Sequence, residues 1–109
     1  YQAIKDDILG ESYELSLAFV GATRAQRLNR DYRKKSYVPN VLSFPLSKQC
    51  GEIFITPAVA SREAKRFSMT KKGYLAYLFI HACLHLKGHH HGATMEQAEE
   101  RYCRKYRLC

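Results

Sequence analysis

The chain has 109 residues, of which 46% are hydrophobic and 26% are charged. This length predicts a single domain, residues 1–109, around one hydrophobic core, and the composition excludes disordered and fibrous proteins. Eighteen Lys and Arg against ten Asp and Glu give a formal charge of +8. Such a charge attracts nucleic acid, an anionic membrane or an acidic protein, although a basic surface alone requires none of them.

The first elements are a strand and a helix. Residues 12–19 alternate apolar and polar side chains, which predicts a half-buried strand that ends before Gly21. Thr23 and Gln26 have the spacing of a capping box. They predict the start of a basic helix that ends near Arg33.

Two short β-prone runs follow, at 40–45 and 51–56. They predict a pair of strands joined in a hairpin-like unit by a longer loop. Thr56 as the N-cap and Pro57 at the first helical position then predict a helix that continues to about Phe67.

The last two predicted elements are helices on either side of a histidine-rich loop. Thr70 caps the first, which ends at Gly88, and its interior, residues 74–86, is apolar on nearly every side. Thr94 and Gln97 predict the start of the second. The expected fold is α+β, with a small mixed sheet of three or more strands packed against helices and the apolar helix buried at the centre.

All five histidines lie in the stretch FIHACLHLKGHHHG, residues 79–92. His81 and His85 are four residues apart, so a helix places both on one face with their Cβ atoms about 5–6 Å apart. Gly88 ends the helix, and His91 follows on the returning chain. The pattern H-x-x-x-H-x-x-G-x-x-H therefore predicts three ligands to one metal ion.

Three imidazoles without a cysteine favour a catalytic zinc site, one ion per chain, because structural zinc sites usually use four protein ligands. Nickel, cobalt and copper also bind such a set. The alternative is that His81 and His85 are hydrogen-bonded core side chains and the loop is solvated, but burial of two imidazoles without partners costs free energy. His89 and His90 are expected to support the site from outside it or to face solvent.

The ligand spacing is also that of the metzincin proteases, H-E-x-x-H-x-x-G-x-x-H, in which the Glu after the first His is the general base. Here that position is Ala82. The sequence therefore argues against a metalloprotease.

The predicted cellular location follows from three absences. The longest apolar run, residues 74–86, is shorter than the roughly 20 residues that span a bilayer, and residues 1–10 lack a signal-peptide pattern. The four cysteines form no C-x-x-C pair, which favours a reducing, cytoplasmic protein without membrane association and leaves a Cys103–Cys109 disulfide open.

Four motifs occur in a fixed order: LNRDYR (28–33), VPNVLSFP (38–45), GEIFI (51–55) and HACLHLKGHHH (81–91). In this order and spacing the chain resembles the YbeY family of bacterial and organellar endoribonucleases, which mature ribosomal RNA. The resemblance covers about residues 13–91.

The resemblance implies that His81, His85 and His91 are the metal ligands and that Arg33 is the functionally important arginine. A guanidinium binds phosphate through two hydrogen bonds and stabilises charge that develops in a transition state. Without the resemblance, Arg33 is one more cation on a basic helix. The chain departs from the family pattern at four positions: Pro39, Ala82, His89 and His90.

The sequence thus predicts a zinc-dependent, single-strand-specific endoribonuclease that acts in ribosomal RNA processing and ribosome quality control. Arg33, His81, His85 and His91 are the predicted catalytic residues, and RNA and the ribosome or its proteins are the predicted partners. The basic segments 33–35, 71–72 and 104–107, and Arg62 with Lys65 and Arg66 in the segment 62–66, would contact the RNA backbone. The alternative is a non-catalytic, zinc-stabilised protein that binds RNA or the ribosome. The oligomeric state stays open.

Overall fold

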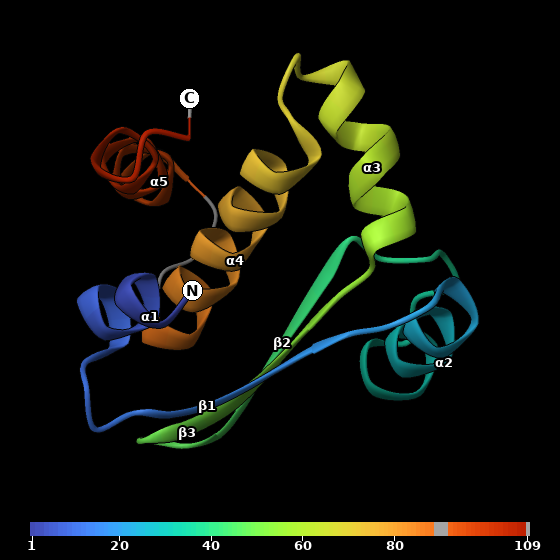
Figure 1. The fold of residues 1–109 in the computed structure, drawn as a ribbon. Coiled ribbons are helices and arrows are strands. Elements are labelled where there is room, and N and C mark those ends of the chain that lie inside the picture. Colours follow the sequence, from blue (N-terminus) through green and yellow to red (C-terminus); the bar gives the residue numbers. More distant parts are fainter. Residues whose placement is uncertain (89–91, 109) are drawn as a thin grey trace.

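The computed structural model describes residues 1–88 and 92–108. His89, His90, His91 and Cys109 lie outside the described residues, and so does any Cys103–Cys109 disulfide. The described elements are α1 (Gln2–Leu9), β1 (Glu14–Phe19), α2 (Ala22–Arg33), β2 (Val41–Ser47), β3 (Cys50–Ile55), α3 (Pro57–Arg66), α4 (Lys71–Lys87) and α5 (Ala93–Lys105). They confirm the predicted α+β class, with helices packed against a small sheet (Figure 1).

The sheet has three strands in the order β1-β3-β2. β3 is parallel to β1 and antiparallel to β2, so the sheet is mixed, as predicted. A parallel pair needs a crossover connection, and the connection from β1 passes through α2, on the sheet face away from α4 (Figure 1). Ile53 and Ile55 of β3 belong to the core that includes α4. Phe54, between them, points the other way, where the Arg24 guanidinium of α2 lies 5.8 Å from its ring centroid.

The predicted longer loop between β2 and β3 is wrong. β2 continues to Ser47 and β3 begins at Cys50, so only two residues connect the strands. Pro45 and Gly51, which mark the connection in the sequence, instead lie opposite each other in the ladder, and an irregularity in the register follows Pro45. A proline is tolerated here because β2 is an edge strand.

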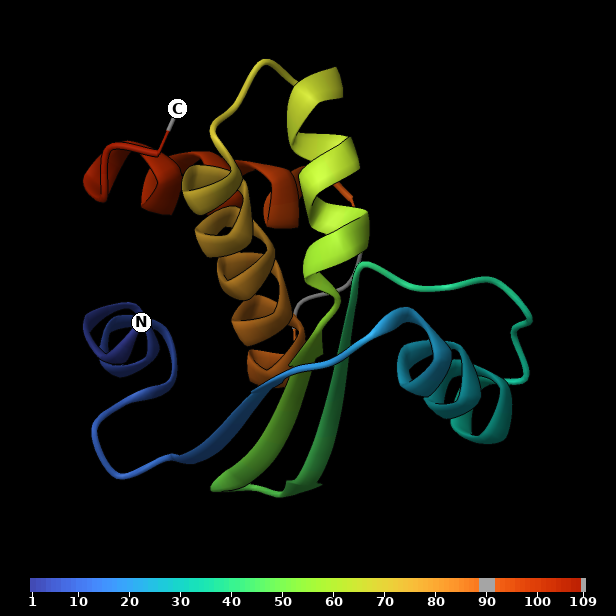
Figure 2. The same ribbon diagram turned by 45° about the vertical axis from the view of Figure 1, so that its right-hand side comes forward.

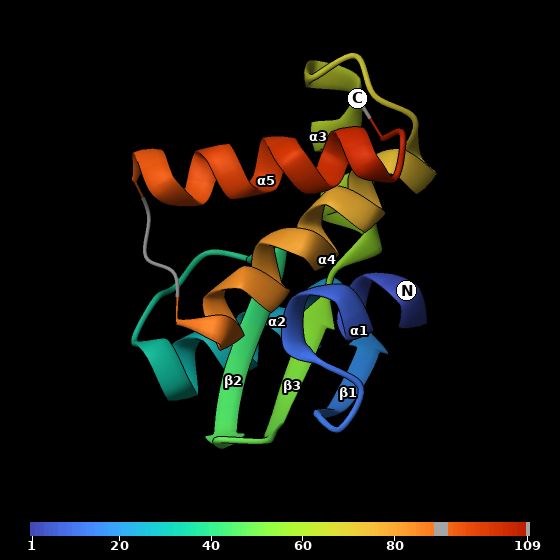
Figure 3. The same cartoon turned by 90° about the vertical axis from the view of Figure 1, so that its left-hand side faces the viewer.

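Helix α4 is central and buried, as its sequence predicts. It contacts α1, α3, α5, β2 and β3, and it lies between the sheet and α5 (Figures 2 and 3). Its buried residues are Tyr74, Leu78, Phe79, Ile80, Ala82, Cys83 and Leu84. These side chains point in nearly every direction, and they make up seven of the seventeen buried residues of the described core, more than any other element supplies.

Both predicted ends of α4 are confirmed. The Thr70 side chain accepts a hydrogen bond from the backbone N–H of Gly73 at 3.0 Å. Gly88 adopts a left-handed conformation with φ of 106°, which costs glycine little because it has no Cβ. Thr56 is the N-cap residue of α3 and Pro57 follows it, also as predicted, but the Thr56 side chain makes no capping hydrogen bond.

The two predicted capping boxes are wrong. Helix α2 begins at Ala22 after Gly21, and α5 begins at Ala93 after Gly92, so each helix starts before the predicted threonine cap. Alanine is the best helix former and glycine is an acceptable N-cap, so these pairs extend both helices toward the N-terminus.

Helix α1 was not predicted from the sequence. It has eight residues, and only Ile4 and Ile8 of its apolar side chains are fully buried, in the core shared with α4. Two apolar residues at a spacing of four are too weak a pattern to identify a helix in isolation. Tertiary packing against α4 therefore stabilises α1.

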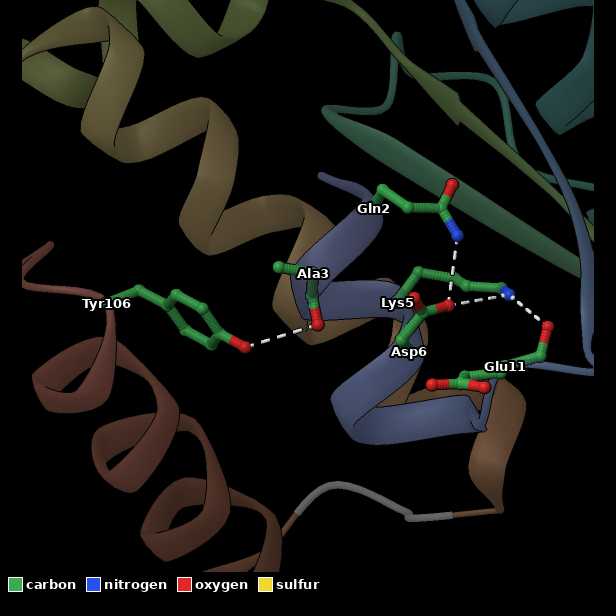
Figure 4. Close-up of polar contacts among 6 residues, drawn as sticks. All are labelled: Gln2, Ala3, Lys5, Asp6, Glu11 and Tyr106. Atoms are coloured by element: carbon green, nitrogen blue, oxygen red, sulfur yellow. Dashed lines mark hydrogen bonds and ion pairs between the residues drawn. The ribbon is translucent and has the colours of Figure 1, made fainter.

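Polar contacts fix the two ends of α1 (Figure 4). Lys5 is buried, and its Nζ donates to Asp6 Oδ1 at 2.9 Å and to the carbonyl of Glu11 at 3.0 Å. Tyr106, just after α5, donates from its hydroxyl to the carbonyl of Ala3 at 3.2 Å. The end of α5 and the start of α1 are thereby joined.

We expect Gly51→Ala to destabilise the protein by roughly 1–3 kcal/mol, because the new Cβ would collide with the hydroxyl of buried Tyr13 and press on Leu86. That hydroxyl has no hydrogen-bond partner among residues 1–88 and 92–108. Tyr13→Phe alone should therefore be neutral or slightly stabilising, and the double variant should recover part of the loss. Urea unfolding measures all three; strictly additive effects would contradict the proposed collision.

Candidate active site

Two imidazoles project from one face of α4. The Nε2 atoms of His81 and His85 are 3.2 Å apart, and the ring centroids are 4.7 Å apart. Both side chains are partly exposed at the edge of the core. The predicted placement of the pair on one helix face is confirmed.

A carboxylate that the sequence analysis missed orients His81. Glu99 of α5 is buried, and its Oε2 lies 2.7 Å from Nδ1 of His81. With a proton on Nδ1, the imidazole donates to Glu99 and presents Nε2 toward His85. A carboxylate on the far nitrogen is the usual support of a metal-binding histidine. No sequence signal distinguishes Glu99 from its neighbours Glu96 and Glu100.

The spacing of the pair fits a metal ion. Two nitrogen ligands at about 2.0–2.1 Å from a tetrahedral zinc are about 3.3 Å apart, close to the observed 3.2 Å. The third predicted ligand, His91, lies outside the described residues, as do His89 and His90. Within residues 1–88 and 92–108, no group of three His, Cys, Asp or Glu side chains is arranged to hold a metal ion. The metal site therefore stays a prediction.

The histidine pair opens into a pocket of about 500 Å³, which we call the histidine pocket. Its polar lining comes from α2, the segment after it, β2 and α4: Arg33, Tyr37, Asn40, Ser43, His81 and His85. The structure thus brings Arg33 into the same pocket as the two histidines, although 47 residues separate Arg33 from His81. Tyr37, Asn40 and Ser43 were not identified from the sequence.

Side-chain hydrogen bonds from α2 hold the segment that forms one wall of the histidine pocket. Gln26 donates to the carbonyl of Ser36 at 2.7 Å. Asn29, fully buried, donates to the carbonyl of Tyr37 at 3.0 Å. These two bonds fold the chain back along α2 and place Tyr37 beside Arg33, the last residue of the helix.

Asn40 is held from the other side. Its Nδ2 donates to Oε1 of Glu63 at 2.9 Å, and its Oδ1 accepts the backbone N–H of Val41 at 2.7 Å. The same Glu63 oxygen accepts the hydroxyl of Tyr74 at 2.9 Å. One carboxylate on α3 therefore ties the start of β2 to α4 at the edge of the histidine pocket.

The Lys and Arg residues of the predicted basic segments are exposed. Those at 33–35, 62–66 and 71–72 lie at the end of α2, along α3 and at the start of α4. In the segment 104–107, two cations form ion pairs, Lys105 with Asp7 and Arg104 with Glu100. This C-terminal segment is therefore less suited to phosphate binding than the others.

Within residues 1–88 and 92–108, no helix is long and apolar enough to cross a bilayer.

The fold and the histidine pocket define a class of small α+β proteins in which two histidines of one helix line a pocket together with an arginine from a crossover helix. A family model described as Endoribonuclease YbeY matches residues 2–107, and the chain belongs to the YbeY family. The resemblance found in the sequence motifs is thereby confirmed.

Curated relatives agree with this membership. An Endoribonuclease YbeY of Mesoplasma florum is 31% identical over 105 residues, covering 86% of this chain and 62% of the relative. Another, of Polynucleobacter asymbioticus, is 41% identical over 81 residues, covering 71% of this chain and 52% of the relative. The chain thus spans little more than half of the length of these proteins.

A solved structure shows the same fold. The solution structure of TM1509 from Thermotoga maritima superposes with a TM-score of 0.67 at 23% identity, covering 96% of this chain and 80% of that one.

We expect Glu99→Gln to lower the pKa of Tyr77. Burial, the negative charge of Glu99 and a hydrogen bond to its carboxylate raise the pKa of Tyr77 to about 12. An unfolded tyrosine ionises near pH 10. The contribution of Tyr77 to stability is therefore complete below about pH 10 and is lost as the pH rises toward 12. A ¹³C NMR titration measures the pKa, with Tyr77→Phe to assign the signal. An unchanged pKa of Tyr77 in Glu99→Gln would show that Glu99 does not raise it.

Proposed function

We propose that this protein is a metal-dependent endoribonuclease that cleaves single-stranded RNA. The observation that carries the proposal is that Arg33, His81 and His85 line one pocket. A guanidinium binds phosphate oxygens, and paired imidazoles bind a Lewis-acid metal ion. Cleavage of a phosphodiester uses both kinds of group. The names of the YbeY relatives support the same reaction class.

Arg33 is the proposed phosphate-binding residue. It lies at the C-terminal end of α2, next to two more cations, Lys34 and Lys35. The guanidinium would bind the two non-bridging oxygens of the scissile phosphate and offset the charge that develops there. The formal charge of +8 would draw RNA to this surface before any specific contact forms.

His81, His85 and His91 are the residues that would hold a zinc ion. When bound, the ion supplies Lewis-acid activation of the phosphodiester and of the group that attacks it. Glu99 accepts a hydrogen bond from Nδ1–H of His81 and so keeps Nε2 available as a ligand. The attacking group is either water or the 2′-hydroxyl; a 5′-phosphate product indicates water, and a cyclic or 3′-phosphate indicates the 2′-hydroxyl.

Single-stranded regions of ribosomal RNA are the proposed substrate, the ribosome or its proteins are the proposed partners, and the cytoplasm is the proposed location. A pocket between α2, β2 and α4 suits a flexible strand, whose backbone can bend into it, better than a rigid duplex. The family motifs support roles in ribosomal RNA processing and ribosome quality control.

We expect His85→Ala to abolish RNA cleavage while the protein stays folded. His85 is partly exposed, so its loss removes a metal ligand without a large core cavity. End-labelled single-stranded RNA is incubated with wild type, wild type with chelator, and the variant, with zinc content and circular dichroism recorded. If the variant neither folds nor binds RNA, the result would favour the alternative function, a zinc-stabilised RNA-binding protein without catalytic activity. Equal cleavage by all three samples would show contaminating nuclease.

We expect Arg33→Ala to lower kcat/KM by about 10²–10³-fold, because it removes a charged donor from the reacting phosphate. Arg30→Ala is the matched control: it lies on the same helix, is exposed, and pairs only weakly with Asp31 at 3.5 Å. The control should lower affinity slightly at low salt and leave kcat unchanged. Equal effects of the two substitutions would reduce Arg33 to a general surface cation.

A further inference from the structure

A second pocket, of about 290 Å³, lies next to the histidine pocket. We call it the aromatic pocket. Its walls come from the start of β2, the α3–α4 connection and α4, and they consist of Asn40, Phe67, Met69, Tyr74, Tyr77, Leu78 and His81. Asn40 and His81 line both pockets, so the two are adjacent and share a wall. The proposed function uses only the histidine pocket, and the aromatic pocket is unassigned.

Three aromatic rings form a stack along this pocket. The ring centroids of Phe67 and Tyr74 are 5.8 Å apart with planes inclined by 19°. Tyr74 and Tyr77 are also 5.8 Å apart, inclined by 24°. Phe67 is 61% exposed, a large fraction for a phenylalanine, whereas Tyr74 is buried. The exposed ring of Phe67 therefore forms the outer end of the stack, where a further flat group can pack against it.

The electrostatics favour a neutral group over a phosphate in the aromatic pocket. Its lining includes neither Lys nor Arg. On the α5 side, Met69 and Tyr77 also border a hollow lined by three carboxylates: Glu96, Glu99 and Glu100. These charges would repel a phosphate. The Asn40 side chain, bonded to Glu63, supplies the polar group at the junction with the histidine pocket.

We propose that the aromatic pocket binds an unpaired nucleobase of the RNA whose phosphodiester occupies the histidine pocket. A nucleobase is flat, neutral and able to stack on an aromatic side chain, which is how proteins commonly bind bases of single-stranded RNA. The inference rests on the proposed function, because the phosphate and its neighbouring base enter two pockets that share a wall. It also explains a preference for single strands, since a paired base is not free to enter.

The chain has no tryptophan, so Phe67→Trp introduces a single fluorescent reporter at the mouth of the aromatic pocket. The probes are single-stranded oligoadenylate and a ribose-phosphate oligomer of equal length without bases. We expect oligoadenylate to quench the tryptophan and the abasic oligomer to leave it unchanged. Phe19→Trp is the matched control, because Phe19 is 50% exposed on β1 and lines neither pocket. Its fluorescence should respond to neither oligomer.

Affinity gives the second readout. Phe67→Ala should weaken oligoadenylate binding about five-fold or more, the effect of one lost stacking contact, and leave abasic binding unchanged. Phe19→Ala should change neither. Three outcomes would overturn the proposal. Phe67→Ala could weaken the binding of both oligomers equally, the fluorescence of Phe67→Trp could fail to distinguish them, or the protein could bind neither oligomer. Binding is measured with a chelator present, so that the proposed metal-dependent cleavage does not consume the oligomer. Base-dependent quenching by a protein that cleaves no RNA when supplied with zinc would contradict the proposed function and leave this inference standing. RNA cleavage without base-dependent quenching would contradict this inference and leave the proposed function standing.

Discussion

A seventeen-residue helix that is apolar on nearly every side loses stability wherever water reaches it, so α4 has to be covered along its whole length. The sheet covers one side, and α1, α3 and α5 cover the others. This constraint explains why short elements with weak patterns of their own, such as α1, fold at all. The sheet that covers α4 also anchors α2 and the segment after it, because they connect β1 to β2.

Two histidines in such a helix have to find polar partners or reduce its stability. The structure meets this requirement for His81 with a buried carboxylate from a separate helix, Glu99, and turns both Nε2 atoms toward each other. The same contact joins α4 to α5. The hydrogen bond between Glu99 and His81 therefore serves both the stability of the fold and the proposed metal chemistry. Loss of Glu99 should affect both.

Charge is distributed unevenly around the two pockets. The histidine pocket is lined by Arg33 at the end of α2, the aromatic pocket has no Lys, Arg, Asp or Glu side chain among the described residues of its lining, and carboxylates of α5 line the hollow beside it. A nucleic acid strand carries both charged phosphates and neutral, flat bases, so a surface divided in this way suits its two chemical parts. Asn40, whose side chain is hydrogen-bonded to Glu63, lies at the boundary between the histidine pocket and the aromatic pocket.

The sequence by itself determined the local elements with strong periodicity, the burial of α4, the histidine pair on one face of that helix and the family. These depend on contacts within a few residues or on linked motifs. The family resemblance implied that Arg33 acts with the histidines, but only the tertiary structure gave the pocket that they share. It alone also decided that Glu99 orients His81 and that Phe67, Tyr74 and Tyr77 stack. Each of these joins separate elements, and the packing around α4 sets their distances, which no local pattern encodes.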